Sequence, residues 1–135
     1  MDLVIVGVAD GHVAALRALF DTDETADEEL TAFLSELRLV KDEHEVGQLQ
    51  AACDATALGF EDVVRALDQA KGTSERWIEG VFGLRARVEG NDVGYGSICA
   101  AGPHACVLHW TDNDGPVEDG QLVLLDMGVE GHELY

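Results

Sequence analysis

The spacing of hydrophobic residues changes along the chain, from a mainly helical pattern before about Gly90 to short strands and turns after it. Near the start, the continuous apolar run 3–8 contains β-branched residues, which predicts a buried strand. Residues 12–20 predict a short helix, and the acidic, polar residues 21–27 predict a loop. Residues 28–39 predict a second helix, because their apolar side chains recur at helical spacing.

The longest predicted helix runs from about Asp42 to Ala70. Asp42 with Glu45 three residues on is an acidic variant of the capping box that marks helix starts, and Gly72 suits the residue after a helix end. We expect one apolar stripe of this helix to pack on a sheet formed by residues 93–135. The stripe consists of Val46, Leu49, Cys53, Ala57, Phe60, Val63, Val64 and Leu67.

Another helix is expected to begin after Ser74, whose hydroxyl can cap the first turn. Glu75 in that turn is favoured by the positive end of the helix dipole. We expect this helix to pack on the same sheet. Its predicted buried side consists of Trp77, Ile78, Val81, Phe82 and Leu84.

The remaining residues predict strands separated by turns. Residues 95–100 and 105–110 flank a Gly-Pro turn at Gly102, which predicts a β-hairpin. Asp-Gly pairs before the next apolar run indicate further turns. Residues 121–129 are the clearest predicted strand, because they form the longest apolar run of this part of the chain.

The charge of the chain argues against several classes of function. Eight Lys and Arg stand against 27 Asp and Glu, which gives a formal net charge of −19. Nucleic acids and anionic membranes attract basic surfaces, so we expect neither as a partner. No apolar run approaches the ~20 residues of a membrane-spanning helix, and the first residues lack the basic start of a signal peptide. The chain has three cysteines, an odd count that indicates reduced thiols. Together these features predict an acidic, cytoplasmic protein.

Asp126 is the most conspicuous candidate functional residue, because it lies within an apolar run. Alternate side chains of a strand share a face, which places Asp126 with Leu122, Leu124 and Gly128. A carboxylate among apolar side chains needs a cation, a metal or several hydrogen-bond donors, and no Lys or Arg is near it in the sequence. The alternative is an Asp that accepts turn or backbone hydrogen bonds at a strand end, and the pattern alone leaves both open.

Two histidines, His104 and His109, lie on either side of Cys106, with Cys99 upstream. A zinc site of these four residues is conceivable, but they lack the paired ligands two to four residues apart that structural zinc sites use. Ordinary buried cysteines are the simpler interpretation. A nucleophilic pair of Cys106 and His109 is disfavoured, because residues three apart on one strand point to opposite faces.

Four segments taken in order resemble the pita-bread metallopeptidases, and among these most of all the Xaa-Pro aminopeptidases (aminopeptidase P), with the prolidases next. The resemblance runs from about Leu37 to Tyr135 and lies in the segments LRLVKDEHEVGQLQAACDATALGFEDVV, SERWIEGVFG, GYGSICAAGPHACVLHWTDN and GQLVLLDMGVEGHELY. Its specific parts are the Gly102 turn, the LHWTDN segment with His109 and Asn113, and the GQLVLLDMG strand. Methionine aminopeptidases carry a His-Gly-Ile-Pro type segment in place of LHWTDN, so that segment separates the subfamilies.

The resemblance implies an α+β fold, the pita-bread (creatinase/aminopeptidase-like) fold, in which helices pack on a curved antiparallel sheet. Residues 37–135 would form the first part of the pita-bread catalytic domain, truncated after Tyr135. Residues 1–36 would be the C-terminal remnant of an N-terminal, creatinase-like α/β domain. The pattern itself also indicates a fragment with an incomplete fold, because a strand begins at the third residue and the chain stops four residues into a new one.

The resemblance also implies a metal site. In that family two divalent metal ions, commonly manganese in aminopeptidase P, are held by two Asp, one His and two Glu. Asp126 would be the first Asp ligand, and His109 would line the substrate site and stabilise the transition state. His104, beside the Gly102 turn, is expected to line the same pocket. The other ligands would lie after Tyr135, so we expect this segment alone to be inactive and to bind no metal tightly.

The function implied for the full-length protein is metal-dependent hydrolysis of the N-terminal residue that precedes proline in a peptide. A prolidase-type dipeptidase and a non-catalytic pita-bread module that binds a protein partner stay open, as does an acidic structural protein without a site. Asp126 and His109 favour the enzyme, since a binding module needs neither. The expected partner is a proline-containing peptide substrate, and the full-length protein could also form a homo-oligomer.

Overall fold

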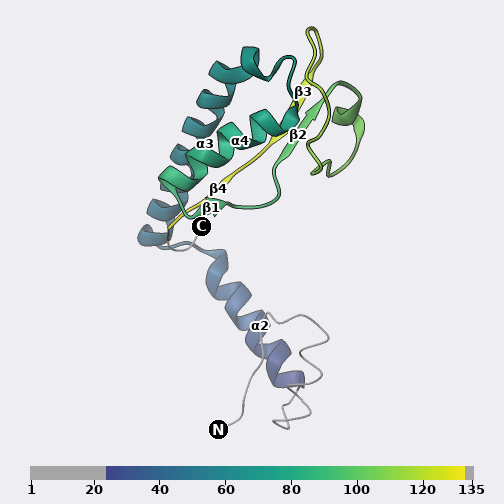
Figure 1. The fold of residues 1–135 in the computed structure, drawn as a ribbon. Helices are drawn as coiled ribbons and strands as arrows, with labels where there is room; N and C mark the ends of the chain where they lie inside the picture. Colours follow the sequence, from purple (N-terminus) through teal and green to yellow (C-terminus); the bar gives the residue numbers. More distant parts are fainter. Residues whose placement is uncertain (1–23, 133–135) are drawn as a thin grey trace. The chain divides into compact units, whose positions relative to one another are not determined.

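A computed structural model describes residues 24–132 of the chain, which divides into two compact units, residues 1–42 and 43–135 (Figure 1). The strand predicted at residues 3–8 and the helix predicted at residues 12–20 lie outside the described residues. The described part of the first unit is one helix, α2 (Glu24–Leu39). This helix begins inside the predicted loop, so the loop prediction is wrong for residues 24–27. Acidic residues such as those of this segment are favoured in a first helical turn by the helix dipole.

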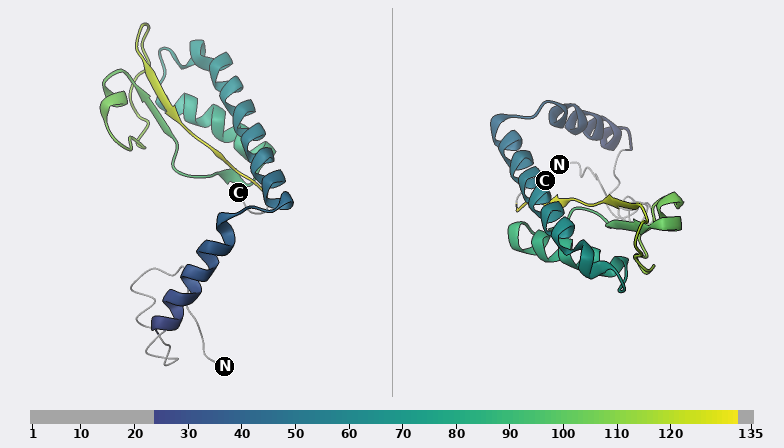
Figure 2. Two further views of the ribbon diagram at one scale, coloured as in Figure 1. Left: turned by 180° about the vertical axis from the view of Figure 1, so that it is seen from behind. Right: turned by 90° about the horizontal axis from the view of Figure 1, so that it is seen from above.

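The second unit is built on two long helices that were both predicted from the sequence. These are α3 (Glu43–Ala70) and α4 (Glu75–Glu89), and the chain reverses between them at Gly72, whose φ of +79° is a left-handed conformation. The two helices lie side by side in Figures 1 and 2. Within residues 24–132, none of the helices combines the length and apolar character needed to cross a bilayer.

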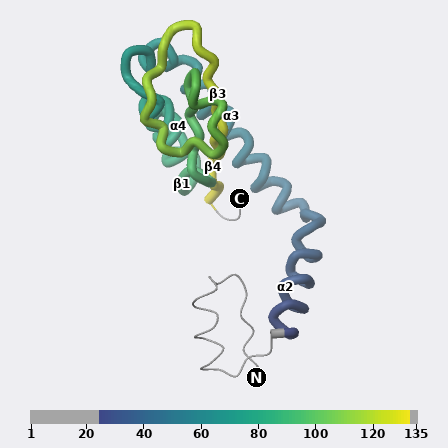
Figure 3. The backbone as a smooth tube through the Cα atoms, turned by 90° about the vertical axis from the view of Figure 1, so that its right-hand side faces the viewer, coloured from purple at the N-terminus to yellow at the C-terminus, as the bar shows by residue number. Residues whose placement is uncertain are grey.

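The strands of this unit form two short antiparallel sheets that follow one another along the same pair of chain segments (Figure 2). One sheet pairs β1 (Asp92–Val93) with β4 (Val129–Glu130), and the other pairs β2 (Ile98–Ala101) with β3 (Val123–Asp126). Helices α3 and α4 contact these strands (Figure 3). The buried residues of these strands are Cys99, Ala100 and Ala101 of β2 and Val129 of β4.

The predicted hairpin of residues 95–100 and 105–110 is wrong. Strand β2 pairs instead with β3, and the segment after it forms a 3-10 helix, η1 (Gly102–Cys106), followed by a turn. Two residues explain the difference: Gly102 has a left-handed φ of +52°, and Pro103 has no N–H for a strand ladder. The predicted strand 121–129 is present as the two shorter strands β3 and β4.

The core lies between the two helices and the strands. Its most buried large apolar side chains are Phe82, Ile78 and Val63. On α4 the buried line is Glu75, Ile78, Phe82 and Ala86, with spacings of three, four and four residues as expected for one helix face. Trp77 and Leu84, predicted on this face, lie off that line and are 45% and 70% exposed. The stripe predicted on α3 is likewise only partly covered, because Val46 and Val64 are 55% and 64% exposed.

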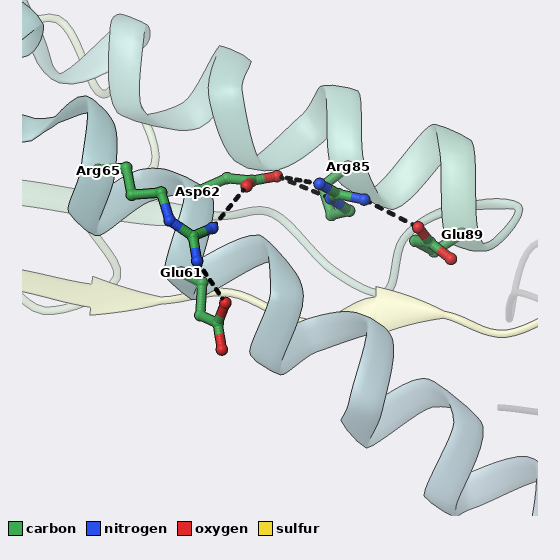
Figure 4. Close-up of polar contacts among 5 residues, drawn as sticks. All are labelled: Glu61, Asp62, Arg65, Arg85 and Glu89. Carbon is green, nitrogen blue, oxygen red and sulfur yellow. Dashed lines mark hydrogen bonds and ion pairs between the residues drawn. The ribbon is translucent and has the colours of Figure 1, made fainter.

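A chain of ion pairs joins α3 to α4 on the surface (Figure 4). Arg85 of α4 donates from Nε and Nη2 to Asp62 Oδ2 of α3, each at 2.7 Å, and from Nη1 to Glu89 at 2.9 Å. Arg65 bonds Asp62 and Glu61 on α3. The hydrogen bond from Arg85 holds the pKa of Asp62 below its ordinary value, although partial desolvation acts to raise it. Two bonds from one guanidinium fix the relative rotation of the helices more than they add stability.

Gly59 lets the two helices approach closely, which gives a first testable prediction. A Cβ atom at Gly59 would lie 2.5 Å from Cε2 of the buried Phe82 ring. We expect Gly59→Ala to destabilise the protein by about 1–3 kcal/mol, because the ring has no free space into which to move. Gly80→Ala on α4 is the matched control, since nothing lies within 4 Å of its Cβ position, and it should stabilise by about 0.5–1 kcal/mol. Equal shifts of the two unfolding midpoints would contradict this packing.

Candidate metal and substrate site

Asp126 is the last residue of β3 and pairs with Ile98 of β2. The strand shows the predicted alternation: Val123 and Leu125 are partly buried toward the core, while Leu124 and Asp126 are exposed. Asp126 therefore lies on the solvent-exposed side of β3. Its apolar neighbours in sequence lie on the other face or are themselves exposed, so the carboxylate keeps its access to solvent.

The Asp126 carboxylate accepts one hydrogen bond. Tyr95 donates its phenol O–H to Asp126 Oδ1 at 2.6 Å. That bond, with partial burial, raises the pKa of Tyr95 to about 12, so the phenol keeps its proton at neutral pH. The Tyr95 ring lies against the backbone of Gly128, where a Cβ would come within 3.0 Å of it. Oδ2 of Asp126 has no hydrogen-bond partner among residues 24–132.

On the exposed side of β3, the Asp126 carboxylate can serve as one ligand of a hard divalent cation. An exposed carboxylate oxygen without a protein donor is the ligand that manganese or magnesium ions prefer. Residues 24–132 contain no group of three or more His, Cys, Asp or Glu side chains arranged to hold an ion. Asp126 could therefore contribute to a metal site that other residues complete.

An open groove of about 430 Å³ lies beside this face, between α3 and the strands. Tyr95, Gly128 and Val129 line it on the strand side, and Leu49, Ala52, Cys53 and Thr56 line it on α3. Thr56 also accepts a hydrogen bond from the Val129 N–H at 3.0 Å, which joins α3 to β4. Because Tyr95 lines the groove and bonds Asp126, the groove and the carboxylate are adjacent.

His109 lies in the turn after η1, with an exposed side chain and a left-handed φ of +53°. Its neighbour Leu108 is 90% exposed. Among the described residues no hydrogen bond or ion pair joins His109 to Asp126. The structure thus presents both side chains to solvent on separate segments, and a catalytic or substrate-binding role for His109 stays a prediction.

His104 is in η1 and is held by two protein groups. Its Nδ1 lies 2.9 Å from Glu75 Oε1, and its ring stacks on the Trp110 ring at a centroid distance of 3.8 Å. A carboxylate has no hydrogen to donate, so Nδ1 of His104 carries the proton. The side chain is still 29% exposed. The structure gives His104 a structural role, and its predicted place in a substrate pocket stays a prediction.

Glu75 is the functional candidate that sequence reasoning missed. Its side chain is fully buried and accepts four hydrogen bonds. Oε1 accepts from the Ala101 N–H at 2.7 Å and from His104, and Oε2 accepts from Trp110 Nε1 at 2.8 Å and the Gly115 N–H at 2.9 Å. Burial raises the pKa of Glu75, but these donors together outweigh it and hold the pKa below its ordinary value. The carboxylate is therefore a buried anion paired with dipoles instead of a cation.

Two further buried groups fix the segments around this carboxylate. Asn113, in the left-handed region with φ of +48°, accepts the Cys99 N–H at 2.8 Å and donates to the Ser97 carbonyl at 2.9 Å. Cys99 packs on Met127, with 3.6 Å between the sulfur atoms, and burial is the main cause that raises the pKa of its thiol to about 12. Cys53 and Cys106 are exposed. No zinc cluster of the type considered from the sequence is present within residues 24–132.

Comparison with known proteins places this geometry in context. The sequence model of metallopeptidase family M24 matches residues 47–135. Xaa-Pro aminopeptidase 1 of Streptomyces coelicolor is 65% identical over 132 residues, which are 96% of this chain and 27% of that protein. Xaa-Pro aminopeptidase 2 of the same species is 60% identical over 128 residues, 95% of this chain and 27% of that protein. The chain thus spans about a quarter of the length of these relatives.

Solved structures show the same similarity. Aminopeptidase PepP of Pseudomonas aeruginosa superposes with a TM-score of 0.63 at 34% identity, over 70% of this chain and 21% of that one. Proline aminopeptidase P II of Yersinia pestis gives a TM-score of 0.65 at 32% identity, over 72% of this chain and 22% of that one. The arrangement of α3, α4 and the strands therefore occurs in proteins of known structure.

Proposed function

The chain belongs to metallopeptidase family M24 and carries part of the pita-bread fold, and from this premise we propose that the protein containing it is a metal-dependent Xaa-Pro aminopeptidase. The observation that carries the proposal is the 65% identity to an Xaa-Pro aminopeptidase over 96% of the chain. The exposed carboxylate of Asp126 supports it, because this side chain is a hard-cation ligand presented to solvent beside a groove.

Each candidate residue has a defined task in this proposal. Asp126 would hold the divalent metal ions through its carboxylate, with Tyr95 fixing one oxygen through the phenol hydrogen bond. The metal ions, when bound, supply Lewis acidity toward the scissile carbonyl and an activated water. His109 would donate a hydrogen bond to the oxygen on which negative charge develops. His104 would line the substrate pocket with the edge of its ring.

We propose manganese as the metal pair, because carboxylate oxygen ligands suit hard cations such as Mn²⁺. The full-length protein, stripped with a chelator and reconstituted separately with Mn²⁺ and Zn²⁺, tests this proposal. Higher turnover with manganese is expected, and higher turnover with zinc at equal metal content would contradict it.

The alternative within the family is a prolidase-type dipeptidase. An aminopeptidase of this kind hydrolyses the bond before proline in a tripeptide or longer peptide. A prolidase requires a dipeptide, in which proline is the last residue and its own carboxylate is free. Comparing kcat/KM of the full-length protein on a tripeptide with proline at its second position and on the matching dipeptide separates the two. We expect the tripeptide to be the better substrate. A preference for the dipeptide would establish the prolidase instead, and no hydrolysis of either would support the binding module.

Replacing His109 tests its assigned task. In the full-length protein His109→Ala is expected to lower kcat by ~10²–10³-fold, the usual effect of losing one hydrogen-bond donor to a developing oxyanion. Metal content should stay at the wild-type level, because His109 is not assigned as a ligand. The matched control is His44→Ala, at the exposed start of α3, which should leave kcat unchanged. A wild-type kcat in His109→Ala would remove this residue from the mechanism.

A further inference from the structure

The segment that carries His109 makes four hydrogen bonds to one buried carboxylate, that of Glu75. Residues 101–115 leave β2, pass through η1 and return beside the N-terminus of α4. Glu75 accepts hydrogen bonds from both ends of this segment, at Ala101 and Gly115, and from two side chains within it, at His104 and Trp110. The Glu75 N–H also donates to the Gly115 carbonyl at 2.9 Å. One side chain on α4 thus bonds both ends of this fifteen-residue segment and two side chains within it.

His109 has a backbone conformation that its own contacts do not explain. Its φ of +53° lies in the left-handed region, which costs a residue with a Cβ roughly 1–3 kcal/mol and persists only where the surrounding structure enforces it. The His109 side chain makes no hydrogen bond or ion pair within residues 24–132. The conformation must therefore be imposed by the chain on either side of it.

Both flanks of His109 lead to Glu75. On one side the next residue, Trp110, donates its indole N–H to Glu75 Oε2 and stacks on His104. On the other side η1 closes with a hydrogen bond from the Val107 N–H to the His104 carbonyl at 2.8 Å, and His104 itself bonds Glu75 Oε1. The His104 ring packs directly against the backbone of Gly115, since a Cβ at Gly115 would collide with that ring.

We propose that Glu75 is a positioning residue for His109: it holds Trp110 and His104 so that the turn between them keeps His109 in its left-handed conformation and its imidazole at one place. This inference rests on the proposed function only for the consequence in turnover. The positioning itself is a property of residues 75–115. A carboxylate suits the task because two oxygens accept four bonds at once, and charge-assisted bonds are short and strong.

The substitution Trp110→Phe tests the proposal in the full-length protein with little risk to folding. It removes one donor to Glu75 and keeps an aromatic ring to stack on His104. We expect kcat on a proline-containing tripeptide to fall about tenfold, with KM and metal content near wild type, because small misplacements of a reacting group cost one to two orders of magnitude. The matched control is Trp77→Phe, an exposed tryptophan on α4, which should leave kcat unchanged.

A double-mutant comparison separates positioning from general structural damage. If Glu75 and Trp110 act through His109, then Trp110→Phe should cost less than about twofold in kcat when His109 is already alanine. An equal, tenfold loss in the wild-type and His109→Ala backgrounds would overturn the proposal, and so would a wild-type kcat in Trp110→Phe. Glu75→Gln, which keeps the side-chain size and one acceptor oxygen, should show the same dependence on His109 with a larger loss, up to ~10²-fold.

A spectroscopic measurement tests the positioning without any activity. With ¹³C-labelled histidine, the His109 imidazole resonance is assigned by its absence in His109→Ala. We expect this resonance to shift or broaden in Trp110→Phe and in Glu75→Gln, while it stays in place in Trp77→Phe. An unchanged His109 resonance in both variants would overturn the inference. If the wild-type protein hydrolyses no proline-containing peptide, the proposed function fails, and this spectrum still decides the positioning.

Discussion

Replacing Asp126 by alanine in the full-length protein should lower kcat/KM on a proline-containing peptide by ~10³-fold or more. The substitution removes a carboxylate that the proposal assigns to the metal ions, and metal-assisted charge stabilisation contributes several kcal/mol to such reactions. Metal content should fall in parallel, because the remaining ligands leave the ions under-coordinated. Loss of the Tyr95 hydrogen bond at this exposed position has little effect on stability by comparison.

The matched control for this substitution is Asp112→Ala. Asp112 is an exposed carboxylate in the loop between η1 and β3, and no hydrogen bond or ion pair involves it among the described residues. It should keep wild-type activity and metal content, so that loss of one negative charge is not itself the cause. Full activity in Asp126→Ala with two metal ions still bound would remove Asp126 from the metal site.

The largest effect on stability is expected for Glu75→Ala. The variant leaves the buried N–H groups of Ala101 and Gly115 and the partly buried indole N–H of Trp110 without an acceptor, and each buried group of this kind costs about 1–3 kcal/mol. We therefore expect a loss of about 3 kcal/mol or more, measured by equilibrium denaturation of the full-length protein. Glu79→Ala, on the same helix and without a hydrogen bond to a described residue, should change stability by less than about 0.5 kcal/mol. A similar, small loss in both variants would contradict the network.

The lowered pKa of Glu75 determines how the stability of the protein depends on pH. Its folded pKa lies below the ordinary value of 4.5, so folding favours the ionised form. The stabilisation is therefore present in full above the ordinary pKa and is lost as the pH falls through the folded pKa. The difference in unfolding midpoint between wild type and Glu75→Ala should be constant from about pH 7 to about pH 5 and shrink below about pH 4. A difference that grows on acidification would contradict the sign of the shift.

The helices of the second unit were predictable because their signal is local. Helix α3 carries apolar residues at helical spacing over its 28 residues, and Gly72 follows its end. The segment after β2 carried no comparable signal. Residues 105–110 form a short apolar run that suits a strand. They cannot pair with β2 as predicted, because β3, some 25 residues further along the chain, pairs with β2 instead. Short apolar runs are ambiguous for this reason.

Of the candidate site, the sequence could identify Asp126 but neither its exposure nor Glu75. Asp126 could be found from the sequence, because a carboxylate in an apolar run is a local anomaly. Its exposure could not, since exposure depends on which elements cover β3. Glu75 had no local signal beyond its place at a helix start, and its four donors lie 26 to 40 residues further along the chain. Only the folded arrangement brings those donors to one carboxylate.

A comparison of two peptides tests whether the full-length protein is, as we propose, a metal-dependent peptidase that acts before proline. Two peptides that differ only at the second residue, proline in one and alanine in the other, are incubated with the protein before and after removal of its metal, and the products are identified by mass spectrometry. We expect the first residue to be released from the proline peptide alone, and this release to be lost with the metal and restored with Mn²⁺. Cleavage that ignores the proline, or that persists in the metal-free protein, would contradict it.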